Sequence, residues 1–243
     1  MNHRSILTCA VVSMMFCAGC SRAPGRPGPN SEVIPPSQVL DFQLLYSENC
    51  GGCHGRDGKS GTAISLGNPV FLAIADDAAI RRPVANGVPG TPMPAFAETA
   101  GGILTDRQID VIVSGIRSWA KPGAIGGEIP PYAAKLGDPH QGAEVYATYC
   151  SSCHGPEGRG GNKAGSIVNP SYLALTSDQN LRTIVIVGLP ELDAPDWRND
   201  VPGRPMSASE ISDVVAWLAS QRTQFPGQPY PTPTVGPLAR VNP

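Results

Sequence analysis

The sequence predicts an all-α protein made of two similar helical domains in tandem. Apolar residues recur at helical spacing, most clearly at Ile109, Ile112, Val113 and Ile116. The second half repeats the first, because Asn68-Pro69 recurs 101 residues later as Asn169-Pro170. Pro- and Gly-rich segments flank and separate the halves, and a chain of 243 residues is long enough for two domains.

Composition excludes several classes of function. The formal net charge is −2 without clustered Lys or Arg, so we expect no nucleic-acid partner. Apolar residues make up 41% of the chain, which is enough for compact cores. We find no Ser/His/Asp set, phosphate loop or paired-carboxylate motif that would carry catalysis.

The N-terminus has the pattern of an export signal. Arg4 precedes a mostly apolar stretch over 6–16, which is too short to span a membrane, and small residues precede Cys20. This end resembles a bacterial lipoprotein signal, which implies a signal peptide over 1–19, a lipid on Cys20 and a periplasmic protein anchored to a membrane. The alternative is ordinary secretory cleavage that leaves Cys20 free or removes it. Residues 20–37 then form a Pro/Gly-rich tether.

The first domain is expected over 38–120. Ser37 or a neighbour can cap a helix that carries Leu45 and Tyr46 and leads into Cys50. A second helix is expected to begin at Asp77 and to stop at Asn86-Gly87. The amphipathic segment over 105–119 is expected to close the domain.

A linker is expected over 121–139 and a second domain over 140–222. The closing helix of that domain carries four apolar positions, which are Ile211, Val214, Val215 and Leu218. Residues 189–203 are interpreted as an acidic insertion, either a solvated loop or a docking patch. A Pro-rich tail follows over 223–243.

Each half contains two cysteines three residues apart with a histidine directly after them. The residues are Cys50, Cys53 and His54, then Cys150, Cys153 and His154. This spacing allows covalent attachment of a haem through both cysteines and supplies an imidazole to its iron. We therefore predict two covalently bound haem c groups. Structural disulfides or a four-ligand zinc site are the alternatives, but neither explains the adjacent histidine.

Few other ligand candidates remain once the leader is removed. The mature chain keeps two methionines, Met93 and Met206, one in each half. Core packing is the alternative for both. His140 is the only further histidine, and a solvated linker position suits it better than ligation. Arg81 and Arg182 occupy matching places and could reach haem propionates or face water.

Each half resembles a small class I cytochrome c domain, and the whole resembles the two-domain, two-haem cytochromes c of bacterial electron-transport chains. The resemblance covers 41–120 and 141–221. It implies a few helices wrapped around each haem, iron ligation by His54 with Met93 and by His154 with Met206, and hydrogen bonds from the histidines to the carbonyls of Pro69 and Pro170. The prolines beside Met93 and Met206 would stiffen both loops. Gly115 stands where the second half has Trp217, and this departure argues against close helix packing in the first domain.

The predicted function is transfer of single electrons between membrane or periplasmic redox proteins, with no substrate chemistry. A thioether ligand raises the potential of a haem and suits such a carrier. Two alternatives remain. One is a dihaem peroxidase-like enzyme, which needs an open iron position. The other is a fixed cytochrome subunit of a dehydrogenase, oxidase or photosynthetic complex.

Overall fold

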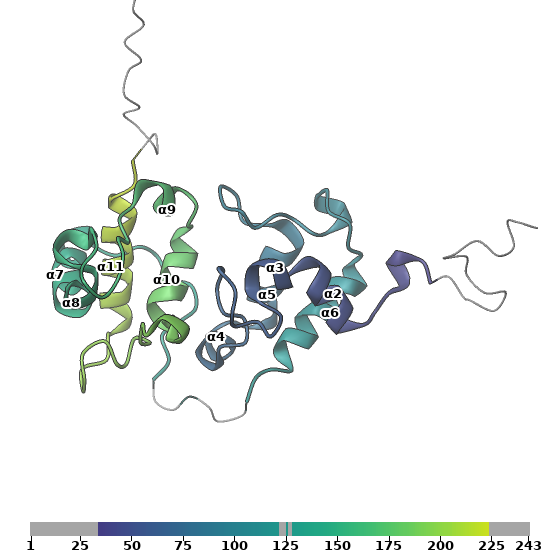
Figure 1. Cartoon of the computed structure of the whole chain (residues 1–243), viewed down its shortest axis with the longest axis horizontal. Helices are drawn as coiled ribbons and strands as arrows, with labels where there is room; N and C mark the ends of the chain where they lie inside the picture. The colour runs from purple at the N-terminus through teal and green to yellow at the C-terminus, as the bar shows by residue number, and fades with distance from the viewer. Residues whose placement is uncertain (1–33, 122–124, 126–127, 224–243) are drawn as a thin grey trace, which may run out of the picture. The chain divides into compact units, whose positions relative to one another are not determined.

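The structure is a computed structural model that describes residues 34–121, 125 and 128–223 (Figure 1). Within that part the regular elements are helices, accompanied by two isolated β-bridges, Ala97 to Leu104 and Leu189 to Ala194. The predicted all-α fold class is confirmed. Among the described residues no helix is long and apolar enough to cross a membrane. The predicted leader, Cys20 and the tail beyond 223 lie outside the described residues, and the domain boundaries stay predictions.

The first repeat contains five α-helices in its described residues and one 3-10 helix. They are α2 (Phe42–Asn49), α3 (Gly51–His54), α4 (Pro69–Ile74), α5 (Asp77–Asn86), η3 (Glu98–Ala100) and α6 (Asp106–Arg117). A separate 3-10 turn, η2 (Pro36–Gln38), precedes them. The four apolar residues predicted to face the core from the closing helix are all buried. The sequence pattern does not predict the short helix α4, because six residues are too few to show a helical period.

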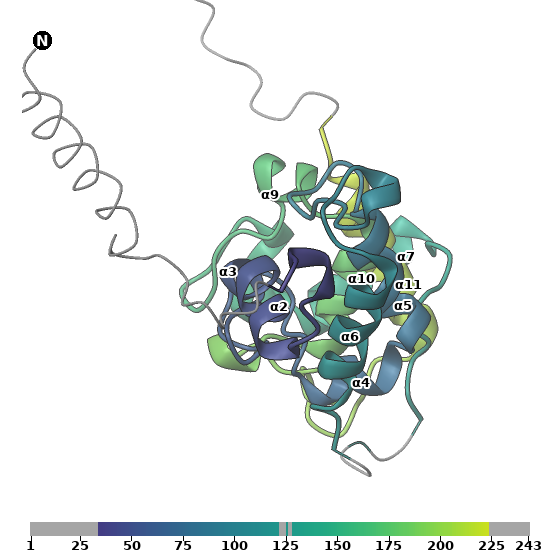
Figure 2. The same cartoon turned by 90° about the vertical axis from the view of Figure 1, so that its right-hand side faces the viewer.

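The second repeat follows the same order of α-helices, with its 3-10 helices at other places. Its elements are α7 (Pro139–Tyr149), α8 (Ser151–His154), η4 (Pro156–Gly158), α9 (Pro170–Ala174), α10 (Asp178–Val187), η5 (Pro190–Leu192) and α11 (Ala208–Ser220). Helices α7 and α11 lie side by side in both views (Figures 1 and 2). The predicted apolar positions of α11 are buried as well, so both closing helices contribute their apolar face to a core.

Side chains at the helix starts explain several boundaries. Asp41, not Ser37, caps the first long helix, because its carboxylate accepts a hydrogen bond from the Leu44 backbone N–H at 2.7 Å. Asp76 caps α5 in the same way, and Gly87 ends that helix with a φ of 68°. Glycine adopts this left-handed conformation without the strain that other residues incur.

Both closing helices begin with a capping box. Thr105 and Gln108 bond reciprocally at the start of α6, and Ser207 and Glu210 do so at the start of α11. Two orphan backbone N–H groups are satisfied at each start. Thr105 and Ser207 therefore occupy equivalent positions at the ends of the loops that precede the two helices.

In each repeat a glycine lies where the first and the closing helix meet, but the two repeats carry it on different helices. In the second repeat, a Cβ atom added to Gly142 of α7 would lie 2.0 Å from the Asp213 carbonyl oxygen of α11. In the first repeat the glycine is on the other helix, since a Cβ atom on Gly115 would lie 2.0 Å from the Phe42 ring. The first domain therefore also packs its two helices closely, with Phe42 filling the space above Gly115.

Candidate functional site

The two cysteine-histidine motifs form one tight helical turn each. In α3 the His54 backbone N–H donates to the Cys50 carbonyl at 3.0 Å, and the equivalent bond in α8, from His154 to Cys150, has the same length. A helical turn places residues i, i+3 and i+4 on one face. Both cysteines and the histidine of each motif can therefore address one flat ligand.

The four motif cysteines are unpaired thiols. Burial raises the pKa of Cys50 to about 11 and that of Cys150 to about 12, so both side chains are protonated at neutral pH. The described residues hold no cluster of three or more His, Cys, Asp or Glu side chains suited to a metal ion. The disulfide and zinc alternatives thus find no support in the described part of the chain.

Both motif histidines have one ring nitrogen fixed by a backbone carbonyl. The Nδ1 atom of His54 lies 2.8 Å from the Ile64 oxygen, and that of His154 lies 2.9 Å from the Gly165 oxygen. A carbonyl only accepts, so Nδ1 carries the proton and Nε2 keeps a lone pair for a metal. Burial also lowers the pKa of His54, which favours the neutral imidazole that ligates iron. The side chains present therefore fit a haem attached through the neighbouring cysteines.

The carbonyls differ from those that the family resemblance implied. Ile64 and Gly165 accept these bonds instead of Pro69 and Pro170. The two acceptors are 101 residues apart, as the repeat requires. A backbone carbonyl leaves no trace in residue identity, so the sequence offered only the offset as a signal.

A tyrosine supports each motif from the preceding helix. The Tyr46 hydroxyl donates to the Gly55 carbonyl at 3.0 Å, and Tyr146 makes the same bond to Gly155 at 2.5 Å. Both glycines have positive φ values, 78° and 74°. Each tyrosine ring also contacts a tryptophan, with centroids 5.1 Å apart for Trp119 and 4.3 Å for Trp217. These contacts hold the turn after each histidine in place.

Met93 lies on a turn between α5 and the closing helix. Its carbonyl accepts from the Val88 N–H at 3.0 Å, and its own N–H donates to the Thr91 hydroxyl at 3.3 Å. The residue is partly exposed and lies between Pro92 and Pro94. Its surroundings are those expected for a methionine on a stiff loop.

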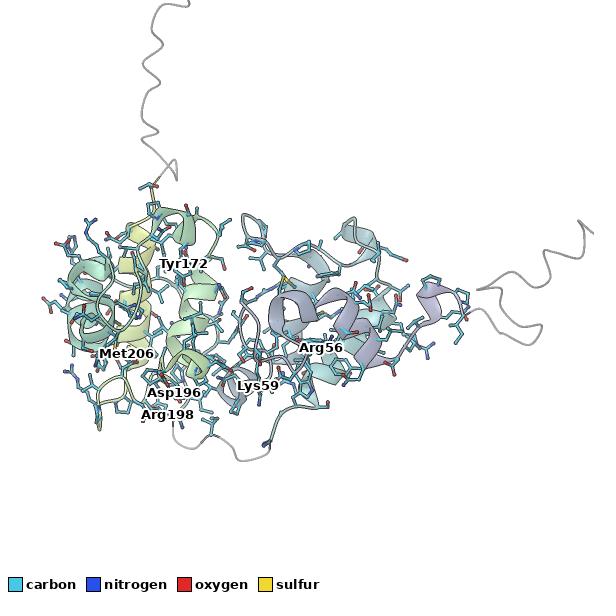
Figure 3. All side chains as sticks on the ribbon, in the orientation of Figure 1. Arg56, Lys59, Tyr172, Asp196, Arg198 and Met206 are labelled. Atoms are coloured by element: carbon cyan, nitrogen blue, oxygen red, sulfur yellow. The ribbon has the colours of Figure 1, made fainter. Side chains whose placement is uncertain are left out.

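Met206 lies in the second repeat (Figure 3), and its local structure differs from that of Met93. It is buried, with 3% of its surface exposed, and it directly precedes Ser207, the cap of α11. Its N–H donates to the Trp197 carbonyl at 2.9 Å. Met93, in contrast, stands twelve residues before its cap, Thr105.

The predicted insertion over 189–203 is wrong. The Leu189 N–H donates to the Ala194 carbonyl at 2.9 Å, which repeats the bond of Val88 to Met93 without a gap. Only one extra residue appears before the closing helix, since Trp197 and Ser207 are ten positions apart whereas Phe96 and Thr105 are nine apart. The prediction of an insertion follows from pairing Met206 with Met93, which are 113 residues apart, in a repeat that otherwise matches at 101.

The acidic residues of this loop are partly engaged. Asp196 pairs with Arg198 at 2.6 Å, and the Arg198 guanidinium lies 4.9 Å from the Trp197 ring centroid (Figure 3). Burial and the nearby Asp196 carboxylate raise the pKa of Asp200 to about 7. The loop is therefore not simply a solvated acidic patch.

Three candidate residues remain: two arginines that make contacts within the protein and one exposed histidine. Arg81 pairs with Asp106 and Asp110. Arg182 is buried and donates to the Pro131 carbonyl and the Ser212 hydroxyl. Both guanidinium groups are therefore engaged by protein oxygens. His140 is exposed in the first turn of α7.

A family model matches the chain over both repeats. The family is described as cytochrome c oxidase, cbb3-type, subunit III, and the matched residues are 37–114 and 137–218. These segments make up most of the chain and each contains one attachment motif. The chain belongs to this family. It is a class I c-type cytochrome with two haem domains, as the motifs and the helical fold predicted.

Two curated relatives of this subunit III family member are cbb3-type cytochrome c oxidase subunits named FixP. The protein from Azorhizobium caulinodans is 30% identical over 145 residues, which are 56% of this chain and 45% of the relative. The protein from Sinorhizobium medicae is 25% identical over 149 residues, covering 56% of this chain and 47% of the relative. The chain spans about half the length of the curated relatives that it matches.

Two solved structures share partial likeness with this chain. One is a reducing HAO-like protein complex of Kuenenia stuttgartiensis, 19% identical, with a TM-score of 0.45 over 79% of this chain and 100% of that chain. The other is a thiosulfate dehydrogenase of Marichromatium purpuratum, 16% identical, with a TM-score of 0.29 over 84% of this chain and 50% of that chain.

Proposed function

We propose that this cytochrome binds one haem c at each motif and passes single electrons between redox proteins. The observation that carries the proposal is the repeated turn in which two free thiols stand beside a histidine whose Nδ1 proton is already held by a carbonyl. Haem c supplies an iron that alternates between Fe(III) and Fe(II). The chain itself supplies thioether anchors and a fixed imidazole, which keep the ligands unchanged during transfer.

In the first repeat, Cys50 and Cys53 anchor the haem, and His54 and Met93 ligate its iron. A thioether favours Fe(II) over Fe(III), so Met93 raises the potential. Cys150, Cys153 and His154 hold the second haem. Membership of a cytochrome subunit family supports a carrier and not an enzyme.

The partners in this proposal are larger membrane redox proteins. Two relatives are named as oxidase subunits, which supports a place as a cytochrome subunit of such a complex. A lipid on Cys20 and a periplasmic location would raise the local concentration near a membrane partner. Cys20→Ser is expected to release the protein from the membrane fraction, and co-purification from detergent-solubilised membranes separates a fixed subunit from a free shuttle.

Haem stoichiometry tests the central statement. The full chain is produced with c-type haem maturation, and haem per protein is measured by pyridine haemochrome spectra and intact mass. We expect two haems, and one in the double variant Cys150→Ser, Cys153→Ser. Ser152→Ala, at the exposed position between these cysteines, is the matched control and keeps two. A wild-type protein with a single haem would contradict the proposal.

A further inference from the structure

The loop that carries Met93 has a direct counterpart in the second repeat. The Thr91 N–H donates to the Val88 carbonyl at 3.1 Å, and the Leu192 N–H donates to the Leu189 carbonyl at 2.8 Å. Together with the gap-free bond from Leu189 to Ala194, these contacts place the two loops in one register. The offset is 101 across this loop, from Val88 and Leu189 to Phe96 and Trp197, so the position of Met93 is occupied by Ala194.

Glycines at the helix ends give the same register independently. A Cβ atom on Gly87 would lie 2.9 Å from the Met93 carbonyl oxygen. A Cβ atom on Gly188 would lie 2.7 Å from the Ala194 carbonyl oxygen. Both glycines have left-handed φ values, 68° and 70°, and both allow the returning loop to approach the helix end closely.

Met206 has its own counterpart, and it is not Met93. The Leu104 N–H donates to the Phe96 carbonyl at 2.8 Å, as Met206 does to Trp197. Leu104 and Met206 each directly precede the capping residue of the closing helix. Their exposed fractions are 4% and 3%. Met206 thus has the register and the burial of an apolar core residue.

We propose that the second repeat provides no methionine ligand, because Ala194 stands where the first repeat has Met93, and that its haem therefore keeps a sixth position open to exchange. A methyl side chain has no donor atom for iron. The flanking Pro92 is also replaced, by Asp193 with a φ of 57°, so one of the two prolines that stiffen the first loop is missing. The site takes a small neutral ligand of the carbon monoxide class. This inference rests on haem attachment at the second motif.

Carbon monoxide tests the inference on the dithionite-reduced, full-length protein with both haems attached. A titration followed by the Soret shift gives the number of ligands bound per protein. We expect one for the wild type and one for Met206→Leu. We expect two for Met93→Ala, because the first haem then loses its thioether. Ala194→Met supplies a sulfur in the first-repeat position, and we expect it to abolish binding.

Two results would overturn the inference. One is no binding by the wild type together with one equivalent for Met206→Leu, which would make Met206 the ligand. The other is no binding by either protein, which would mean that another side chain fills the position firmly. Haem content is measured on every sample, so a missing second haem is recognised as a failure of the proposed function and not of this inference.

Discussion

Arg117, the last residue of α6, and Arg222, two residues after the end of α11, make the same three kinds of contact. Arg117 donates to the carbonyls of Leu72 and Ala75 at 2.6 and 2.5 Å and pairs with Asp77 at 2.8 Å. Arg222 donates to Leu173 and Thr176 at 3.0 and 2.6 Å and pairs with Asp178. Each guanidinium therefore joins the end of one short helix to the start of the next.

Arg117→Lys is expected to destabilise the protein, although the charge is kept. One ammonium group cannot reach two carbonyls and a carboxylate in this forked geometry, so at least one carbonyl loses its donor. We expect a loss of about 1 to 3 kcal/mol in the free energy of unfolding of the holoprotein, measured by denaturant titration. Arg107→Lys, at an exposed position of the same helix, is the control and should be neutral. Equal stability of Arg117→Lys and wild type would contradict the prediction.

The opposite placement of Gly115 and Gly142 predicts different responses to alanine. Gly115→Ala meets the Phe42 side chain, whereas Gly142→Ala meets the Asp213 backbone. We expect each change to cost about 1 to 3 kcal/mol of stability. Phe42→Leu should restore part of the stability lost in Gly115→Ala, because the smaller leucine side chain leaves room for the added methyl group. A double-mutant cycle measures this coupling, and the absence of any coupling would show that Phe42 does not fill this space.

The attachment motifs and most helices could be predicted from the local sequence. Cys50 to His54 are contiguous, so one helical turn determines how they lie, and capping residues such as Asp76 act on backbone groups within three positions. The contacts of Arg117 and Arg222 could not be predicted from local sequence, because their partners are 40 or more positions away. Arg117 and Arg222 are 105 residues apart whereas Leu72 and Leu173 are 101 apart, so the offset changes between the contacting groups.

The sequence-based pairing of Met206 with Met93 rested on residue type instead of on the repeat offset. Only two methionines remained, one in each half, and both stood near a proline before the closing helix. Residue type therefore suggested one role for both. The backbone bond from Leu189 to Ala194 gives the register of the loop. The sequence carries a signal for the same register, because Pro94 recurs as Pro195 and Phe96 is matched by Trp197 at the offset of 101. The methionine stands in the register of Leu104 instead.

Asp200 predicts a pH dependence of stability in the loop before α11. Burial first, and then the Asp196 carboxylate, raise the pKa of Asp200 to about 7 in the folded protein, from 3.8. A raised carboxyl pKa means that the unfolded chain ionises first, so this group destabilises the fold increasingly as pH rises from about 4 to 7. Asp200→Asn should therefore raise the melting temperature at pH 8 and change it little at pH 4. Thermal unfolding at both values tests this, and an equal gain at both would exclude titration of Asp200 as the cause.

Redox potentials provide a further test of the ligand assignment, independent of carbon monoxide. Met93→Ala removes a thioether that favours Fe(II), so one of the two midpoint potentials should fall, by on the order of 0.1 V within the roughly 0.8 V that axial ligands span. Met206→Leu replaces one apolar core residue by another in the register of Leu104, and both potentials should stay nearly unchanged. Spectroelectrochemical titration of the holoprotein measures both variants against wild type. A drop in one potential for Met206→Leu would return Met206 to the iron, and Ala194 would then be only a residue of the loop.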